Sequence, residues 1–237
     1  MLNFAIDPTL LQPFVPLGIE IDPYRGVTYV SLVGFRFLAT RVLGVGVPLH
    51  RDFEEVNLRF YVRRKSGEDW RRGVVFIREL VPRRAIAFVA RVFYGEPYSA
   101  LPMRHRIDHS SSQIRTEYAW QRCGRWESLH VAGAGEPQSI DRGSQEEFIA
   151  EHYWAYTARI GGCGEYQVEH PRWRVWRGIE AGLDADISGL YGECFTEALS
   201  ARPVSAFIAD GSPITVRKSD LLPRTEPNPL QRASGSS

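Results

Sequence analysis

The chain has 237 residues, 43% of them hydrophobic and 24% charged, which is the composition of a soluble globular protein with a substantial core. Its 29 Lys and Arg residues are balanced by 28 Asp and Glu residues, so the formal net charge is only +1. This balance argues against a protein that attracts nucleic acid or an anionic membrane through an overall positive field.

The sequence carries no pattern for a metal, a cofactor or a membrane span. Cys123, Cys163 and Cys194 lack CxxC spacing, so they predict neither a disulfide framework nor a zinc site. No apolar run approaches ~18 residues, and the first residues lack a basic segment followed by an apolar one. Residues 44–48 (GVGVP) are not a dinucleotide fingerprint, and no Walker A motif occurs. We therefore expect a cytoplasmic protein without metal or cofactor.

The first predicted element is a short helix. Asp7 is a suitable cap and Pro8 suits the first helical position, so a helix begins here and ends at Pro13 or Pro16. The pattern then changes to that of strands. Residues 18–22 and 27–32 flank a turn-forming segment, PYRG, at residues 23–26, which predicts a hairpin.

Further strands follow at short spacing. They are predicted at residues 56–63, 73–79, 85–94, 103–107 and 114–122. Such spacing favours a mainly β, antiparallel, barrel-like domain over alternating strands and helices.

The second half of the chain predicts a few short helices. Ser144 and Glu147 form a capping box for a helix over residues 145–152. Residues 153–159 and 165–170 then form a hairpin through the glycine-rich segment 160–164, with one continuous helix over 145–160 as the alternative. Residues 183–199 are predicted to be partly helical. We expect a single domain over residues 1–222 and a disordered tail over 223–237.

The segment around residue 57 has a polar and an apolar face. In a strand, Glu55, Asn57, Arg59 and Tyr61 point to one side and the intervening apolar residues to the other. The polar side faces either water, as in many antiparallel sheets, or the interior of a barrel.

Arg91 lies in the apolar strand predicted at residues 85–94. A buried guanidinium keeps its proton and needs a carboxylate, from the protein or from a ligand. Glu55 and Glu79 are the candidate partners within the chain. The alternative is a structural ion pair, or an arginine at the exposed end of the strand.

Several segments, in the same order along the chain, resemble those of a known family. These are residues 18–22, 53–62, 91–98 with Met103, 148–153 and 170–173. Together they resemble the YqjF-like family of uncharacterised bacterial proteins (domain of unknown function 2071), over roughly residues 3 to 220. The family has no established reaction. Its superfamily resemblance is to acetoacetate decarboxylase, which implies a cone-shaped, largely antiparallel β barrel with an interior cavity.

The resemblance also implies a departure from that enzyme's chemistry. The enzyme has a glycine-x-proline turn followed by paired lysines, one of which forms a Schiff base. Here Gly95 and Pro97 supply the turn, but Tyr98 and Ser99 follow it. Glu55 and Arg91 match the enzyme's assisting glutamate and arginine. A hydroxyl cannot form an iminium, so acetoacetate-type decarboxylation is not expected. Lys65 and Lys218, the only lysines, lie in charged segments elsewhere in the chain.

Taken together, these features favour a barrel that binds a small carboxylate- or carbonyl-bearing molecule. In this hypothesis Tyr98 or Tyr94 donates a hydrogen bond, Arg91 or Arg59 holds a carboxylate, and Glu55 acts as a base or orients the ligand. The predicted pocket residues are Glu55, Asn57, Arg59, Tyr61, Arg91, Tyr94, Tyr98 and Met103.

Two other hypotheses stay open. One is a structural or interaction protein that self-associates or presents Trp154, Trp173 and Trp176 as an aromatic surface. The other is a diverged lyase-like enzyme that uses non-covalent acid/base catalysis. The expected partners are therefore a small molecule and, in the interaction hypothesis, a second copy of the chain; neither nucleic acid nor a membrane is expected.

Overall fold

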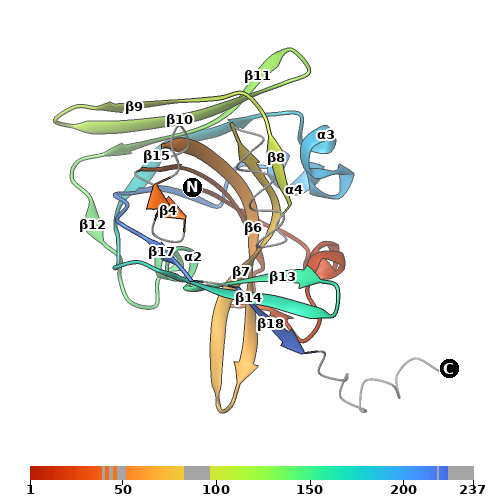
Figure 1. Cartoon of the computed structure of the whole chain (residues 1–237). Coiled ribbons are helices and arrows are strands. Elements are labelled where there is room, and N and C mark those ends of the chain that lie inside the picture. The colour runs from red at the N-terminus through yellow and green to blue at the C-terminus, as the bar shows by residue number, and fades with distance from the viewer. Residues whose placement is uncertain (39–40, 43–44, 47–51, 83–96, 218, 224–237) are drawn as a thin grey trace.

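The computed structural model describes residues 1–38, 41–42, 45–46, 52–82, 97–217 and 219–223 (Figure 1). The strand predicted at residues 85–94, with Arg91 and Tyr94, lies outside these residues. Almost all of the predicted tail also lies outside them.

The described chain is mainly β, as predicted. The strands are β1 (Leu2–Ala5), β2 (Glu20–Ile21), β3 (Tyr29–Phe37), β4 (Arg41–Val42), β5 (Val45–Gly46), β6 (Phe53–Ser66), β7 (Asp69–Val81), β8 (Tyr98–Ala100), β9 (Met103–His109), β10 (Gln113–Arg122), β11 (Arg125–Ala134), β12 (Gln138–Ser139), β13 (Trp154–Arg159), β14 (Gly162–Glu169), β15 (Arg174–Asp184), β16 (Ser205–Ala209), β17 (Thr215–Val216) and β18 (Asp220–Pro223). The helices are η1 (Pro8–Phe14), α2 (Gln145–Ala150), α3 (Ile187–Tyr191), η2 (Glu193–Phe195) and α4 (Thr196–Ser200).

One large sheet dominates the structure. Its main path runs β17-β14-β13-β7-β6-β3-β1-β16-β15-β11-β10-β9, and β4 pairs only with β5. The described strands pair antiparallel except where β7 meets β13 and β8. The sheet curls, so that β9, β10 and β15 lie on one side of Figure 1 and β13 and β14 on the other, with β6 and β7 between them. No pairing between described strands joins β9 to β17, so the described strands form an open, curled sheet with the outline of a cone-like barrel.

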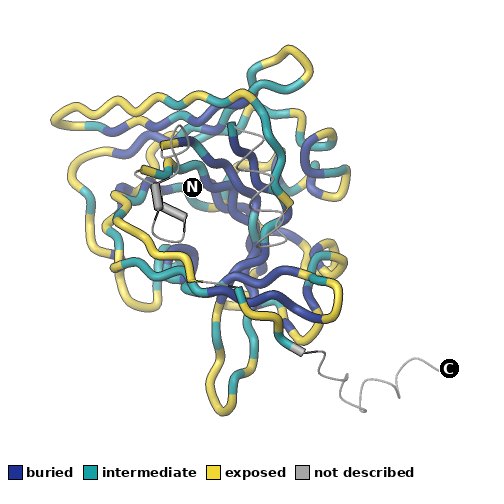
Figure 2. The backbone as a smooth tube through the Cα atoms, in the orientation of Figure 1, coloured by how far each residue is buried: buried dark blue, intermediate teal, exposed yellow. Residues whose placement is uncertain are grey.

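The sheet separates the two larger of three hydrophobic clusters. The larger core includes Leu32 of β3, Leu58 of β6 and Trp120 of β10, all 0% exposed, and Phe195 of η2. The smaller core lies on the other face of β6, where Tyr61 packs against Phe148 of α2. In Figure 2 the buried residues follow these central strands, whereas exposed residues mark the hairpin ends. Alternate residues of β6 therefore enter different environments.

Several predicted elements are confirmed. Asp7 caps η1 by accepting a hydrogen bond from the Thr9 N–H at 2.8 Å. Ser144 caps α2 in the same way, accepting from the Glu147 N–H at 3.1 Å. The β13–β14 hairpin excludes the alternative of a continuous helix over residues 145–160. Short helices follow Asp184, within the segment predicted to be partly helical.

The predicted hairpin of residues 18–22 and 27–32 is wrong in its pairing. Only Tyr24 and Val27 form a bridge across the turn. β2 pairs with β6 at residues 62–63, and β3 pairs with β6 at residues 53–60. The two segments thus lie one after the other along a single long strand. A turn sequence fixes the local bend, but β6 offers both segments a longer partner than they offer each other.

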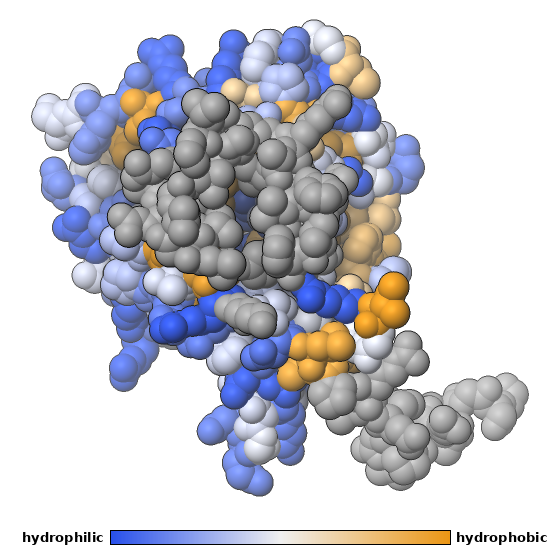
Figure 3. Space-filling model, in the orientation of Figure 1, coloured by the Kyte–Doolittle hydropathy of each residue, from blue (hydrophilic) through white to orange (hydrophobic). Residues whose placement is uncertain are grey.

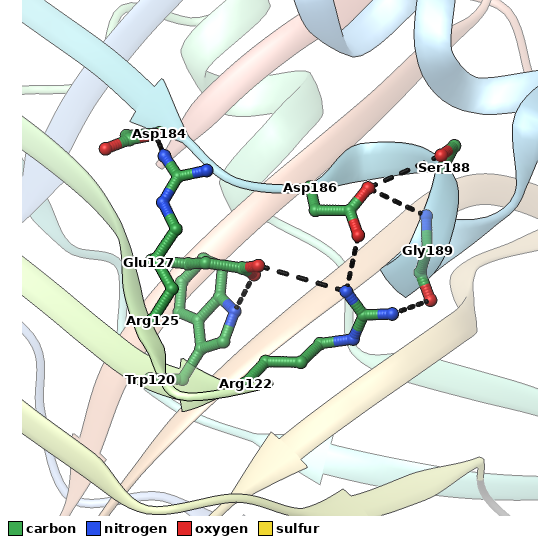
Figure 4. A network of polar contacts seen from close by, with 8 residues as sticks. All are labelled: Trp120, Arg122, Arg125, Glu127, Asp184, Asp186, Ser188 and Gly189. Carbon is green, nitrogen blue, oxygen red and sulfur yellow. Dashed lines mark hydrogen bonds and ion pairs between the residues drawn. The ribbon is translucent and has the colours of Figure 1, made fainter.

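A polar network, buried at Trp120 and Glu127, connects the β10–β11 hairpin to α3 (Figure 4). The Trp120 indole N–H donates to Glu127 Oε2 at 2.7 Å, and both residues are at most 2% exposed. Arg122 lies 3.9 Å from Glu127 and binds Asp186 at 2.6 Å. Arg122 also donates to the Gly189 carbonyl at 2.8 Å. The Glu127 carboxylate is buried, so the protein would lose stability if its partners Trp120 and Arg122 were removed.

Gly73 is required where β7 pairs with β13. A Cβ at this position would lie 2.7 Å from the Trp154 carbonyl oxygen and 2.7 Å from the Tyr156 ring. We expect Gly73→Ala to lower the free energy of unfolding by about 1–3 kcal/mol, because the two strands must separate to admit the methyl group. Urea unfolding checks this, with Glu68→Ala in the exposed turn of the same hairpin as the control. Equal stability of the two variants would contradict this pairing.

No disulfide joins the three cysteines. No helix in the described part of the chain is both long enough and apolar enough to cross a membrane.

Candidate functional site

The polar face of β6 lies in the protein and not in water. Glu55 and Asn57 are each 2% exposed and Tyr61 is 1% exposed, whereas Arg59 is half-buried. The interpretation of this face as the solvated side of a sheet is therefore wrong. The face lies opposite the larger core, on the side of the sheet that α2 covers.

Three adjacent strands place polar residues in one row. In the strand register, Asn57 of β6 lies opposite Glu79 of β7, and Glu79 lies opposite Tyr98 of β8. Paired residues point to the same face of a sheet. Glu55 lies two residues from Asn57 along β6 and shares this face. We call Glu55, Asn57, Glu79 and Tyr98 the polar row.

A β-bulge brings Glu79 into the polar row. Leu58 pairs with Arg78 but Arg59 pairs with Phe76, so Ile77 is an extra residue on β7. Val75 and Ile77 both face the larger core, and strict alternation from them would point Glu79 into that core as well. The extra residue reverses the alternation, which is a common role of bulges near functional sites.

Hydrogen bonds connect the row around Glu55. The Tyr98 hydroxyl donates to Glu55 Oε2 at 3.1 Å, and the Asn57 amide donates to Glu55 Oε1 at 3.2 Å. Asn57 Oδ1 is buried and makes no hydrogen bond to another described residue. A buried acceptor of this kind calls for a further donor, from water or from a ligand.

Burial changes the protonation of the row. It raises the pKa of the Glu55 carboxyl from 4.5 to about 7, and hydrogen bonds from Asn57, Tyr98 and Glu79 and the charge of Arg59 only partly oppose this. Burial, followed by the charges of Glu55 and Glu79, raises the pKa of Tyr98 well above 10. At neutral pH Glu55 can therefore either give or take a proton, whereas Tyr98 keeps its proton and acts as a donor.

Arg59 and Tyr61 extend the same face toward α2. Arg59 Nη2 donates to the Ile149 carbonyl at 3.2 Å, while its Nε is buried without a hydrogen bond to the described residues. The Tyr61 hydroxyl lies 2.5 Å from Ser31 Oγ, and Ser31 donates to Asn3 at 2.6 Å. No described residue thus accepts from Arg59 Nε, whereas the hydroxyl of Tyr61 already has a partner.

The remaining sequence-predicted residues are Arg91, Tyr94 and Met103, to be considered with the two lysines. Arg91 and Tyr94 lie outside the described residues, so their place relative to the row stays a prediction. Met103 begins β9 and packs against the larger core, away from the row. Lys65 is exposed near the turn between β6 and β7, and Lys218 is not described.

The three tryptophans do not form one exposed surface. Trp176 is 8% exposed and donates its indole N–H to the Gly135 carbonyl at 3.0 Å. Trp154 lies under the Arg71 guanidinium, and Trp173 stacks on His170. The predicted aromatic surface is therefore wrong for Trp176. Figure 3 shows a described surface that is mostly hydrophilic, with small, separate hydrophobic areas.

A family model and one curated relative match the chain. The model describes uncharacterized conserved proteins, DUF2071, and matches residues 1–213. The uncharacterized protein YqjF of Bacillus subtilis (strain 168) is 26% identical over 180 residues, which cover 72% of this chain and 69% of YqjF.

Solved structures share the fold at low sequence identity. Acetoacetate decarboxylase from Legionella pneumophila superimposes with a TM-score of 0.59 at 15% identity, over 93% of this chain and 82% of that one. An acetoacetate decarboxylase-like enzyme from Sphingomonas wittichii RW1 gives 0.61 at 14% identity, over 94% and 90%. The enduracididine biosynthesis enzyme MppR complexed with pyruvate gives 0.63 at 13% identity, over 94% and 87%. These likenesses establish an acetoacetate decarboxylase-like fold.

Proposed function

Because this chain belongs to the DUF2071 family of uncharacterized conserved proteins and has the acetoacetate decarboxylase-like fold, we propose that its polar row binds a small molecule with a carbonyl or carboxylate group. The observation that supports this most is Glu55, a buried carboxyl held by Tyr98 and Asn57 with a pKa of about 7. Strongly perturbed buried acids concentrate at functional sites.

Tyr98, Arg59 and Glu55 each have a separate role in this proposal. Tyr98, which stays protonated, donates to the ligand oxygen or holds Glu55 in place. Arg59 offers to a carboxylate its Nε–H, which no described residue accepts. Glu55 takes or gives the proton. Schiff-base chemistry is not part of the proposal, because Tyr98 and Ser99 follow the Pro97 turn and Lys65 is exposed.

Thermal-shift measurements test the binding. The probes are pyruvate, acetoacetate, acetate and acetaldehyde at millimolar concentrations, and pyruvate is included because the MppR structure holds it. A ligand at 100 times its Kd stabilises the folded state by about 2.7 kcal/mol. We expect at least one probe to raise the Tm of the wild type, and we expect the rise to be much smaller in Tyr98→Phe and Glu55→Gln.

Glu68→Gln serves as the matched control, because Glu68 is exposed in the turn between β6 and β7. It should respond to the probe as the wild type does. Equal shifts in all four proteins would mean that the probe binds away from the polar row, and would contradict the proposal.

A second measurement separates a carrier from a catalyst. If Glu55 moves protons of the bound molecule, the protein will speed the exchange of the α-hydrogens of a bound carbonyl compound for deuterium, followed by proton NMR. Loss of this exchange in Glu55→Gln, with binding retained, would support the acid/base role. A cytoplasmic location also remains a proposal, supported by three cysteines that form no disulfide.

A further inference from the structure

A surface cavity lies apart from the polar row. Its volume is about 410 Å³, and none of Glu55, Asn57, Glu79 or Tyr98 lines it. It lies beside α2, where β7, the turn after β2 and the segment before β15 meet.

One side of the cavity is aromatic. Phe148 of α2 is 3% exposed, and the Tyr24 ring lies 5.2 Å from it. Tyr153 supplies a further ring to the lining. Aromatic faces of this kind attract apolar groups and, because of their quadrupole, cations.

Both arginines of the cavity already have carboxylate partners. Arg72 binds Asp22 at 2.6 Å, and Arg172 binds Glu147 at 2.5 Å. The other carboxylate oxygen of Glu147 accepts from the Gly143 N–H at 2.6 Å. These two ion pairs leave no net charge for a ligand to balance.

Glu151 is the remaining acid of the cavity, and it is only partly satisfied. Its Oε2 accepts a hydrogen bond from the Tyr153 hydroxyl. Its Oε1 is buried and has no hydrogen-bond partner within the described ranges, where Glu151 forms no ion pair either. A buried carboxylate oxygen without a donor is costly, so the cavity lacks a positively charged donor at this point.

We propose that this cavity binds a small primary ammonium compound with an apolar body. The ammonium donates to the Glu151 carboxylate, and the apolar body packs on Phe148, Tyr24 and Tyr153. An ammonium group carries three donors and a charge opposite to that of Glu151. An acid of the same shape is disfavoured, because Glu151 repels it and the arginines are already paired.

A matched pair of probes tests the charge preference. Phenethylamine and 3-phenylpropionate have a similar ring and chain but opposite charges, and titration calorimetry at pH 7.5 compares them on the full chain. We expect phenethylamine to bind with a Kd at least about tenfold lower than that of 3-phenylpropionate, and to weaken as NaCl is raised. Tighter binding of the acid, or equal binding of both, would overturn the proposal, as would no binding of the amine at millimolar concentration.

Two variants of neighbouring acids locate the site. Glu151→Gln removes the charge while keeping the size, and should raise the Kd of phenethylamine at least about tenfold. Glu146→Gln on α2 is the control, because Glu146 contacts Arg177 and does not line the cavity; it should leave the Kd unchanged. An unchanged Kd in Glu151→Gln would overturn the proposal. The comparison of the two probes on the wild type needs no variant, so it stands even if Glu151→Gln folds poorly.

Discussion

As the pH rises from 5 to 8, the free energy of unfolding of Glu55→Gln will increase by about 2–3 kcal/mol relative to that of the wild type. The reason is the buried carboxyl, whose pKa is about 7 in the folded protein against an ordinary value of 4.5. In this range the folded protein holds a proton that the unfolded chain has released. Raising the pH therefore lowers the free energy of unfolding of the wild type. The variant does not lose stability in this way, because glutamine does not titrate.

The sign of this effect distinguishes Glu55 from His152. Burial, followed by the charges of Arg59 and Arg72, lowers the pKa of His152 well below 6.5. Its contribution to stability is complete above pH 6.5 and is lost as the pH falls. The contribution of Glu55 is complete below pH 4.5 and is lost as the pH rises to 7. The difference between variant and wild type isolates Glu55, because His152 is present in both.

Urea unfolding at half-unit steps of pH measures the difference, with Glu68→Gln as the control. The free energy of unfolding of the control should change with pH as that of the wild type does, because Glu68 is exposed. The same change with pH in Glu55→Gln would show that Glu55 titrates in the folded protein as it does in the unfolded chain.

Trp120→Phe will destabilise the protein by about 2–4 kcal/mol, although it preserves an aromatic ring in the core. The loss comes mainly from Glu127, which is 2% exposed and accepts the Trp120 indole N–H at 2.7 Å. After the substitution, the described ion-pair partner of this carboxylate is Arg122, 3.9 Å away (Figure 4). The smaller ring adds a cavity to the larger core.

A double-mutant cycle separates the polar loss from the packing loss. Glu127→Leu removes the carboxylate that Trp120→Phe leaves without its donor. We therefore expect the double variant to be more stable than the sum of the two single losses implies, by about 1–2 kcal/mol. Additive losses would mean that the indole and the carboxylate act independently. Urea unfolding at pH 7 gives all three values.

The sequence predicted the polar face of β6 because strands have a fixed period. Glu55, Asn57 and Tyr61 alternate with apolar residues, and the structure buries all three on one face. Alternation alone did not decide whether that face meets water or the interior, because that depends on what covers the sheet. Here α2, more than 80 residues later in the chain, covers part of it through Ile149 and Phe148.

The role of Glu79 in the site was missed for a different reason. A bulge at Ile77 reverses the alternation of β7, and the period of two predicts regular strands only. The sequence singled out Glu79 as a partner for Arg91, but not as a neighbour of Asn57. A weak signal was present: a glutamate in phase with Val75 and Ile77 would lie in an apolar core, where a charged group is unfavourable.

Arg59, like Arg91, is a guanidinium that can hold a ligand acid. A guanidinium with few partners in the protein points to a ligand acid. Arg59 donates to the Ile149 carbonyl and contacts Tyr61, but no described residue accepts a hydrogen bond from its Nε. The apolar surroundings of Arg91 drew attention to it in the sequence. Arg59 was also a candidate to hold a carboxylate, and the structure places α2 beside it.

We propose that Glu55 is a buried acid of a ligand site, and its pKa of about 7 places its titration near neutral pH. Carbon-13 NMR of the glutamate side-chain carboxyls tests this most directly, by following each resonance from pH 3 to pH 9. We expect one resonance with a midpoint near pH 7, absent from Glu55→Gln and shifted by the probe that stabilises the wild type. The proposal would be contradicted if all glutamate resonances titrated below pH 5 and none shifted when a probe was added.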